Sequence, residues 1–240
     1  KCECRIYWDG ALYRLHLAGS SYFFTIEAQT IMPVSEHPMQ ALYDYLPDGT
    51  FERVVNYIHH YRVHLTISKH RKSVLGDYRH SGWGGNHRIS VNGNLNKYEF
   101  LITLLHELAH LLTYEQFKNK VEPHGKEWKK QYSLLLVAFV QWQVFPTDIA
   151  GALQKSIISP SATANGETEL LLILRKYDTV KKEGHHPIIE LPEGALFRTD
   201  NGKIFRKGAM RRKRYECVEI KTGLRYTFSP VTEVRIMPVS

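Results

Sequence analysis

The strongest periodic signal in the chain is an apolar stretch that runs from Tyr98 to Phe117. Large aliphatic side chains occur on nearly every side of the helix that this stretch would form: Leu101, Ile102, Leu104, Leu105, Leu108, Leu111 and Leu112. A helix that is apolar on most sides is normally buried inside a protein. The pattern therefore predicts a central, buried helix.

Shorter patterns predict further elements before this helix. Val54, Val55 and Ile58 share one face of a helix predicted over residues 51–61, and residues 63–68 alternate like a strand. Residues 75–78 form a second predicted strand, and a turn-rich loop follows at residues 81–86. His87 and Arg88 then open a strand over residues 89–91, which we expect to be an edge strand leading into the central helix.

The remainder of the chain divides into helices and then strands. Helices are predicted over residues 125–144, 148–157 (capped by Thr147) and 167–177. Residues 195–238 read as short strands, with hairpin turns at residues 200–202 and 221–223. Together the elements predict an α+β fold: a small sheet packed on the central helix and further helices, followed by a small β-hairpin module.

Composition shifts suggest four segments. Residues 1–38 show no clear period and begin with Lys1, so we expect them to be an extension and Met39 to be the native start. Residues 39–180 hold the predicted sheet and helices, residues 181–194 form a charged linker with proline and glycine, and residues 195–240 form the hairpin module.

The central helix carries the chain's main chemical signal, His106-Glu107-Leu108-Ala109-His110. Side chains four residues apart lie on the same face of a helix, so both imidazoles can bind one zinc ion at about 2.0–2.1 Å. Glu107 can then reach water at that ion, as in zinc-dependent hydrolases, which are usually proteases. The alternative is that these are three core residues satisfied by hydrogen bonds, but a metal and its water would satisfy all of them.

A catalytic zinc site needs a third protein ligand and an open position for water. The spacing typical of metzincins would place this ligand at position 116, where the residue is Gln116. We favour His124, which lies between Pro123 and Gly125 at the start of the next predicted helix. Glu122 and Glu127 are rival ligands, because zinc also accepts carboxylates.

The stretch HRISVNGNLNKYEFLITLLHELAHLLTYEQFKNKVEPHGKEWKK resembles SprT-like (Spartan-type) metallopeptidase domains. The matching features are a strand before the helix, the HELAH motif and the HG-x-x-W segment after a short insertion. The resemblance covers roughly residues 40–145 and implies a zincin-like fold. It also implies that His106, His110 and His124 bind Zn²⁺ and that Glu107 is the catalytic glutamate.

The C-terminal module departs from this family. Many SprT-like proteins end in a zinc ribbon with paired CxxC knuckles, whereas residues 195–240 contain only Cys217, which cannot supply four thiolates. We therefore expect a metal-free module that keeps the shape of a ribbon. Its aromatics, Phe197, Phe205, Tyr215 and Tyr226, alternate with basic residues, which suits either stacking on single-stranded nucleic acid or a small core.

Charge and cysteine content narrow the partners and the compartment. The net charge is +8, and residues 203–225 hold nine Lys or Arg against two Glu. A nucleic-acid partner is therefore expected at the densest cluster, Arg211, Arg212, Lys213 and Arg214, unless these residues only form a solvated basic surface. The longest apolar run, residues 134–140, is too short to cross a bilayer, so no membrane partner is expected. The three cysteines offer no disulfide framework, which favours the cytoplasm.

The sequence thus predicts a zinc-dependent metalloendopeptidase. Glu107 would take a proton from water, whose pKa zinc lowers towards about 7, and pass it to the leaving amine. Tyr78, Tyr98, Tyr114 and His87 are all candidates to stabilise the oxyanion. The resemblance further implies substrates attached to DNA. The alternatives are a non-enzymatic nucleic-acid binder, whose structural zinc takes Glu127 or His87 as a fourth ligand, and a peptidase indifferent to DNA.

Overall fold

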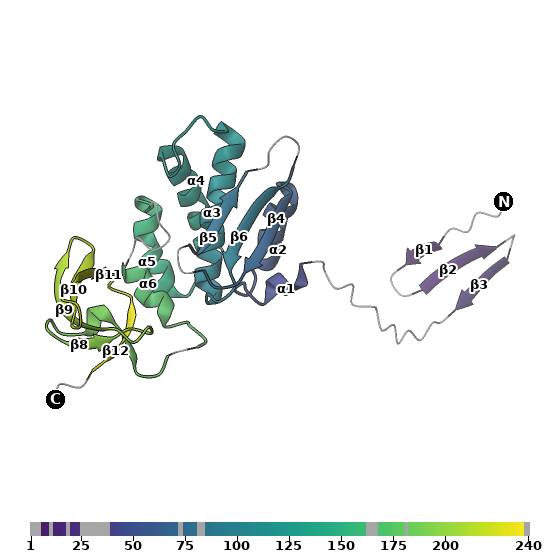
Figure 1. The fold of residues 1–240 in the computed structure, drawn as a ribbon. Helices are drawn as coiled ribbons and strands as arrows, with labels where there is room; N and C mark the ends of the chain where they lie inside the picture. Colours follow the sequence, from purple (N-terminus) through teal and green to yellow (C-terminus); the bar gives the residue numbers. More distant parts are fainter. Residues whose placement is uncertain are drawn as a thin grey trace. The chain divides into compact units, whose positions relative to one another are not determined.

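The computed structural model describes residues 6–9, 12–17, 20–24, 39–71, 74–80, 85–161, 168–180 and 182–237, and divides into two units, residues 1–38 and residues 39–240 (Figure 1). The first unit contains an antiparallel three-stranded sheet of β1 (Ile6–Asp9), β2 (Leu12–Leu17) and β3 (Ser20–Phe24). The sequence pattern had predicted no element there.

The second unit begins with two helices and a three-stranded sheet. These are α1 (Gln40–Tyr43), α2 (Phe51–His60), β4 (Val63–Ser68), β5 (Gly76–Arg79) and β6 (His87–Asn92). The strand order is β4-β6-β5, with β6 parallel to β4 and antiparallel to β5. The expectation that residues 89–91 form an edge strand is therefore wrong. Both sides of β6 are hydrogen-bonded, and β4 and β5 are the edge strands.

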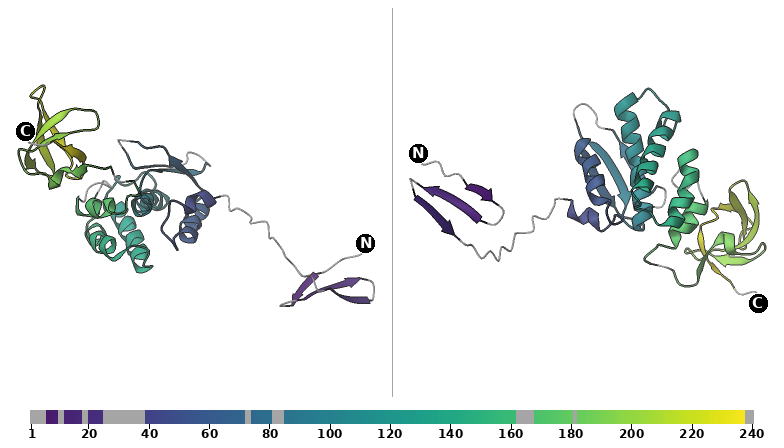
Figure 2. Two further views of the ribbon diagram at one scale, coloured as in Figure 1. Left: turned by 90° about the horizontal axis from the view of Figure 1, so that it is seen from below. Right: turned by 180° about the vertical axis from the view of Figure 1, so that it is seen from behind.

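The two faces of this sheet differ in character. Val63, Ile89 and Val91 are buried beneath α2 and the long helix α3 (Lys97–Phe117), whereas His64 and Arg88 point to the opposite, exposed face. Figure 2 shows the helices on one side of the strands. Because successive side chains of a strand point to opposite faces, the alternation read from the sequence places the polar set on the outside.

Helix α3 begins with a side-chain cap and is buried for most of its length. The Asn96 side-chain oxygen accepts a hydrogen bond from the Glu99 backbone N–H at 3.0 Å. The helix ends at Lys118, whose φ of 55° breaks the helical geometry. The sheet packs on one side of α3 and helix α4 (Lys126–Gln141) on another, which explains why α3 is apolar nearly all round.

Two further helices follow, α5 (Thr147–Ile158) and α6 (Thr168–Arg175). The expected helix cap at Thr147 is wrong by one residue: Pro146 is the N-cap, and Thr147 is the first helical residue. Among the described residues, no helix combines the length and the apolar character needed to span a bilayer.

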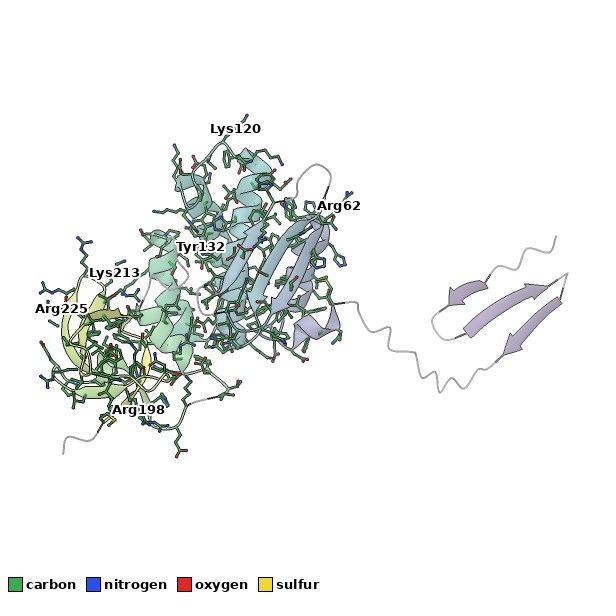
Figure 3. The ribbon with its side chains drawn as sticks, viewed as in Figure 1. Arg62, Lys120, Tyr132, Arg198, Lys213 and Arg225 are labelled. Carbon is green, nitrogen blue, oxygen red and sulfur yellow. The ribbon has the colours of Figure 1, made fainter. Side chains whose placement is uncertain are left out.

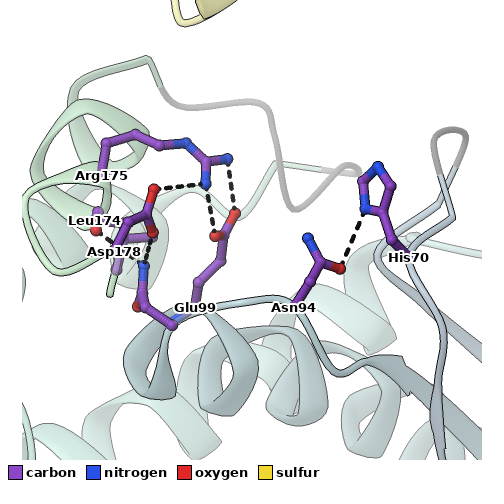
Figure 4. Close-up of polar contacts among 7 residues, drawn as sticks. His70, Asn94, Glu99, Leu174, Arg175 and Asp178 are labelled. Atoms are coloured by element: carbon purple, nitrogen blue, oxygen red, sulfur yellow. Dashed lines mark hydrogen bonds and ion pairs between the residues drawn. The ribbon is translucent and has the colours of Figure 1, made fainter. Parts of the chain in front are cut away.

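A buried ion pair joins the start of α3 to the end of α6 (Figure 4). Glu99 is only 2% exposed, and its two carboxylate oxygens lie 3.2 and 3.4 Å from the Arg175 guanidinium. Arg175 also contacts Asp178 at 3.2 Å, and the Asn96 amide donates to Asp178 and to the Leu174 carbonyl. Burial raises the pKa of Glu99, and Arg175 opposes this effect.

We expect Arg175→Met to lower the free energy of unfolding by about 3–5 kcal/mol, because it leaves the Glu99 carboxylate buried without its cation. Chemical denaturation at pH 7 measures the loss. The matched control is Lys176→Met, which removes a neighbouring exposed charge and should cost less than about 1 kcal/mol. Equal effects of the two substitutions would show that the ion pair does not hold α6 in place.

The C-terminal residues form one antiparallel sheet of six strands in the order β11-β10-β9-β8-β12-β7. The strands are β7 (His185–Pro187), β8 (Leu196–Arg198), β9 (Ile204–Arg211), β10 (Arg214–Glu219), β11 (Arg225–Phe228) and β12 (Glu233–Ile236). The predicted turns at residues 200–202 and 221–223 join β8 to β9 and β10 to β11, as expected. The turn at Arg212 and Lys213 was not predicted, since it contains no glycine.

The expected linker over residues 181–194 is partly wrong. β7 pairs with β12, and the short 3₁₀ helix η1 (Ile188–Glu190) places Ile188 in the module's core together with Leu191. The buried Lys207 ammonium donates to the carbonyls of Leu191 and Ile189. The sequence did not predict this structure, because the segment is polar, contains proline, and pairs with residues that lie far away in the chain.

The aromatic side chains of this module pack in or against its hydrophobic core. Phe197 and Phe205 are 0% and 3% exposed and stack on one another, and Tyr215 and Tyr226 pack against the same cluster. Cys217 is fully buried in that cluster. Phe197 and Phe205 are therefore core side chains, and the partly buried Tyr215 and Tyr226 pack against that core.

Candidate metal centre

Three imidazoles converge where α3 faces the turn before α4. His124 Nε2 lies 2.9 Å from His110 Nε2 and 3.2 Å from His106 Nε2. His106 and His110 come from successive turns of α3, and His124 comes from the loop that follows it. Within the described part of the chain, this is the one group of at least three His, Cys, Asp or Glu side chains close enough to share a metal ion.

The donor set and its spacing fit zinc. Two nitrogens bound tetrahedrally at about 2.0–2.1 Å from a zinc ion lie about 3.3 Å apart, close to the observed separations. No fourth His, Cys, Asp or Glu among the described residues joins the three imidazoles, which matches a site that keeps one position open. One feature departs from the usual pattern: His106 Nδ1 is buried and lacks the hydrogen-bond acceptor that normally orients a ligand.

Burial keeps these imidazoles neutral. Burial, with smaller contributions from the neighbouring histidines, lowers the pKa of His106 to about 3 and that of His110 to about 4. The pKa of His124 is also lowered by burial. Only the neutral imidazole has a lone pair for a metal, so the three rings are ready to bind at neutral pH without first losing protons.

The position of His124 is fixed by its backbone conformation and by contact with Trp128. The residue has a φ of 62°, a left-handed conformation that is uncommon outside glycine. The Gly125 N–H closes the turn onto the Glu122 carbonyl at 2.9 Å, and α4 starts immediately afterwards. Trp128, fully buried on the first turn of α4, lies beneath the three imidazoles with ring centroids 4.6–5.2 Å away. Strain of this kind is typical of functional positions.

The rival ligands do not join the group. Glu122 lines the cleft around the three imidazoles, but neither it nor Glu127 belongs to the cluster of possible donors. His87 lies elsewhere, with Nδ1 3.0 Å from the Tyr78 hydroxyl and Nε2 3.3 Å from a Glu115 oxygen. The choice of His124 from the sequence is thus the one that brings three donors together.

The candidates for stabilising an oxyanion differ in whether they line the cleft. Tyr78 and Tyr114 line the cleft, and Tyr78 stacks parallel to His110. Tyr98 packs instead against Phe145 and Tyr177, and it is not among the residues that line the cleft. His87 is buried and is not among the described residues that line the cleft, but its Nδ1 lies within hydrogen-bond distance of the Tyr78 hydroxyl.

Glu107 lines the same cleft, pressed between α3 and β5. Its carboxyl is 6% exposed, and burial, with a smaller contribution from Asp77, raises its pKa to about 8. Gly76 on β5 makes this position possible. A Cβ atom built on Gly76 would lie 2.5 Å from Glu107 Oε1 and 2.9 Å from Thr103 Cγ2. Sequence reasoning missed Gly76, because a glycine in a strand does not reveal what packs against it.

We expect Gly76→Ala to lower kcat by about 10–100-fold while zinc stays bound, because the added methyl group displaces the Glu107 carboxylate by a fraction of an ångström to an ångström. Steady-state kinetics and metal content measure the two effects. Gly151→Ala is the matched control, since a Cβ at Gly151 meets nothing within 4 Å. An active Gly76→Ala variant would show that the position of Glu107 is not critical.

In the metal-free protein, the buried Glu107 carboxyl should lower the free energy of unfolding as the pH rises. In the unfolded chain the carboxyl loses its proton above about pH 4.5, whereas in the folded protein it keeps the proton up to about pH 8. Folded-state stability therefore falls as the pH rises between these values, by up to about 1.4 kcal/mol per pH unit. We expect metal-free Glu107→Gln to be more stable than metal-free wild type at pH 8, with the difference vanishing near pH 4.5. Urea denaturation across this range tests the sign.

The basic cluster predicted from sequence lies away from these imidazoles in the chain, on the hairpin of β9 and β10. Arg211, Arg212, Lys213 and Arg214 are all exposed. Figure 3 shows Lys213 and Arg225 projecting outward from the C-terminal sheet. Their side chains are therefore accessible to an anionic partner.

Comparison with known proteins supports the resemblance seen in the motifs. The model of the SprT-like family matches residues 39–144. Protein SprT of Glaesserella parasuis serovar 5 (strain SH0165) is 75% identical over 24 residues, which are 10% of this chain and 15% of that protein. No solved structure matches the chain. Residues 39–144 of the chain are therefore similar to the SprT-like family, and the chain spans only a small part of the curated relative that it matches.

Proposed function

We propose that the protein is a zinc-dependent metalloendopeptidase of the HExxH type. The observation that supports this most strongly is the convergence of three neutral imidazoles, His106, His110 and His124, beside the Glu107 carboxyl in one open cleft. Zinc at these nitrogens would supply Lewis acidity to the scissile carbonyl and to the attacking water. The match of residues 39–144 to the SprT-like family points in the same direction.

The residues around the cleft divide the remaining work. Glu107 takes the proton from the attacking water and delivers it to the departing amine. Tyr78 or Tyr114 donates to the oxyanion, since both hydroxyl-bearing rings line the cleft. The Tyr78 hydroxyl is oriented by His87, whose other nitrogen faces Glu115.

The free edge of β5 is the proposed docking site for an extended substrate. β5 is unpaired on the side away from β6 among the described strands, and Gly76, Asp77 and Tyr78 line the cleft. A peptide can add to such an edge through main-chain hydrogen bonds. β6 cannot take this role, because both of its sides are paired with neighbouring strands.

DNA-associated proteins are the proposed substrates. The exposed cations at Arg211, Arg212, Lys213 and Arg214 and the net charge of +8 support a nucleic-acid partner. The alternative of a purely structural zinc requires a fourth protein ligand. Neither Glu127 nor His87 joins the three imidazoles in the described structure, which favours catalysis.

Cleavage of a denatured protein tests the proposal. Full-length protein with one equivalent of zinc is incubated with unfolded casein, with and without single-stranded DNA and with and without a chelator. We expect chelator-sensitive fragmentation that DNA accelerates. Cleavage that DNA does not affect would support the alternative of a peptidase indifferent to DNA. If zinc-loaded protein cleaves nothing in any arm, the proposed peptidase activity is refuted.

A further inference from the structure

The exposed face of the β4-β6-β5 sheet carries a row of three basic side chains. Arg88 on β6 is the direct register partner of Arg79 on β5 and of His64 on β4. All three side chains are exposed on the face opposite to the helices. The row crosses two strand spacings, so it is about 10 Å long.

This arrangement is unfavourable for the free protein. Like charges directly opposite one another on neighbouring strands destabilise a sheet. Asp77 contacts Arg79 Nε at 2.8 Å and leaves the terminal amino groups of that guanidinium available. Neither Arg88 nor His64 has a side-chain hydrogen-bond or ion-pair partner within the described residues. The row therefore presents the Arg88 guanidinium, which no described carboxylate neutralises, beside the terminal amino groups of Arg79 and the His64 imidazole.

The row lines a concavity next to the metal centre. Thr66 and Asn86 supply neutral donors to its wall, and no carboxylate occurs among its described lining residues. His80 lines both this concavity and the cleft of the three imidazoles. A ligand bound here would thus lie beside the open end of the cleft.

We infer that this row, Arg79, Arg88 and His64, is a binding site for the phosphodiester backbone of single-stranded nucleic acid. Guanidinium groups match phosphate oxygens in bidentate geometry. The length of the row exceeds one phosphate and suits neighbouring phosphates of a strand. The site lies on the SprT-like domain itself and is distinct from the cluster at Arg211–Arg214. It requires neither zinc nor hydrolysis.

Binding of fluorescein-labelled oligo(dT) to the full chain tests the inference by fluorescence anisotropy across a salt series. We expect Arg79→Gln/Arg88→Gln to weaken binding by at least about fivefold and to reduce the slope of log affinity against log salt by about 1.4, or 0.7 per lost phosphate contact. Lys129→Gln/Lys130→Gln is the matched control: it removes the same charge from exposed positions on α4 and should leave both values nearly unchanged. Equal losses of affinity in the two double variants would show that binding depends only on net charge, and would overturn the proposed site.

Three further arms identify the ligand and check the fold. Arg88→Lys keeps the charge but loses the bidentate fork, so it should bind oligo(dT) more weakly than wild type. The thermal midpoint of Arg79→Gln/Arg88→Gln should equal or exceed that of wild type, because a repulsion is removed. If inorganic phosphate at low millimolar concentration displaces oligo(dT) completely, or if polyglutamate binds as tightly and loses as much in the double variant, the site recognises anions in general and the nucleic-acid assignment is wrong.

Discussion

Replacing Glu107 with glutamine is expected to lower kcat by about 10²–10⁴-fold, the usual contribution of a positioned general base. Glutamine has nearly the same shape but cannot accept a proton at the pH of the assay. The Glu107 carboxylate lies close against Gly76, so an amide of the same size should occupy the same space without disturbing α3. Hydrolysis of a quenched peptide by zinc-loaded protein measures the loss.

The zinc content decides how that loss is interpreted. Glu107 is not one of the converging donors, so the variant should bind one zinc ion per chain as wild type does. Glu122→Gln is the matched control, because Glu122 lines the same cleft and is assigned no role in proton transfer. Wild-type turnover by Glu107→Gln would rule out the proposed mechanism, and loss of zinc would instead make Glu107 a ligand.

Replacing His124 with alanine is expected to weaken zinc binding by at least about 100-fold, since even indirect partners of a ligand contribute 10–100-fold. His106 and His110 alone would hold the ion with two nitrogens from one helix. Competition with a fluorescent chelator measures the affinity. His124→Asn is a useful companion, because asparagine tolerates the left-handed backbone at φ 62° and separates loss of the ligand from local strain.

Controls at other positions make the assignment of His124 specific. Glu122→Ala and Glu127→Ala test the rival carboxylates and should keep zinc, since neither joins the cluster. His186→Ala removes an exposed imidazole on β7 and should change nothing. If His124→Ala binds zinc as tightly as wild type, the third ligand must be reassigned.

The parts of the fold that follow local rules could be predicted from the sequence. The apolar run predicts the start of α3 to within one residue, and the hairpin turns at residues 200–202 and 221–223 lie where glycine marks them. The HELAH spacing and the break around Pro123 were enough to nominate all three imidazoles, because the chemistry of zinc limits the choice of ligand.

The parts of the fold that depend on distant partners could not be predicted from the sequence. Whether β6 is central or an edge depends on which strands pair with it, and residues 185–191 join a sheet only because β12 and Lys207 lie beside them. Gly76 matters because of a side chain thirty-one positions away. A single sequence holds no local trace of these contacts.

Anomalous diffraction at the zinc edge from crystals of the full chain tests the central claim most directly. We predict one peak per chain, at about 2.0–2.1 Å from the Nε2 atoms of His106, His110 and His124, with no fourth protein ligand and with the Glu107 carboxylate facing the open position. A peak bound by a fourth side chain, or no peak among these imidazoles in zinc-loaded crystals, would contradict it.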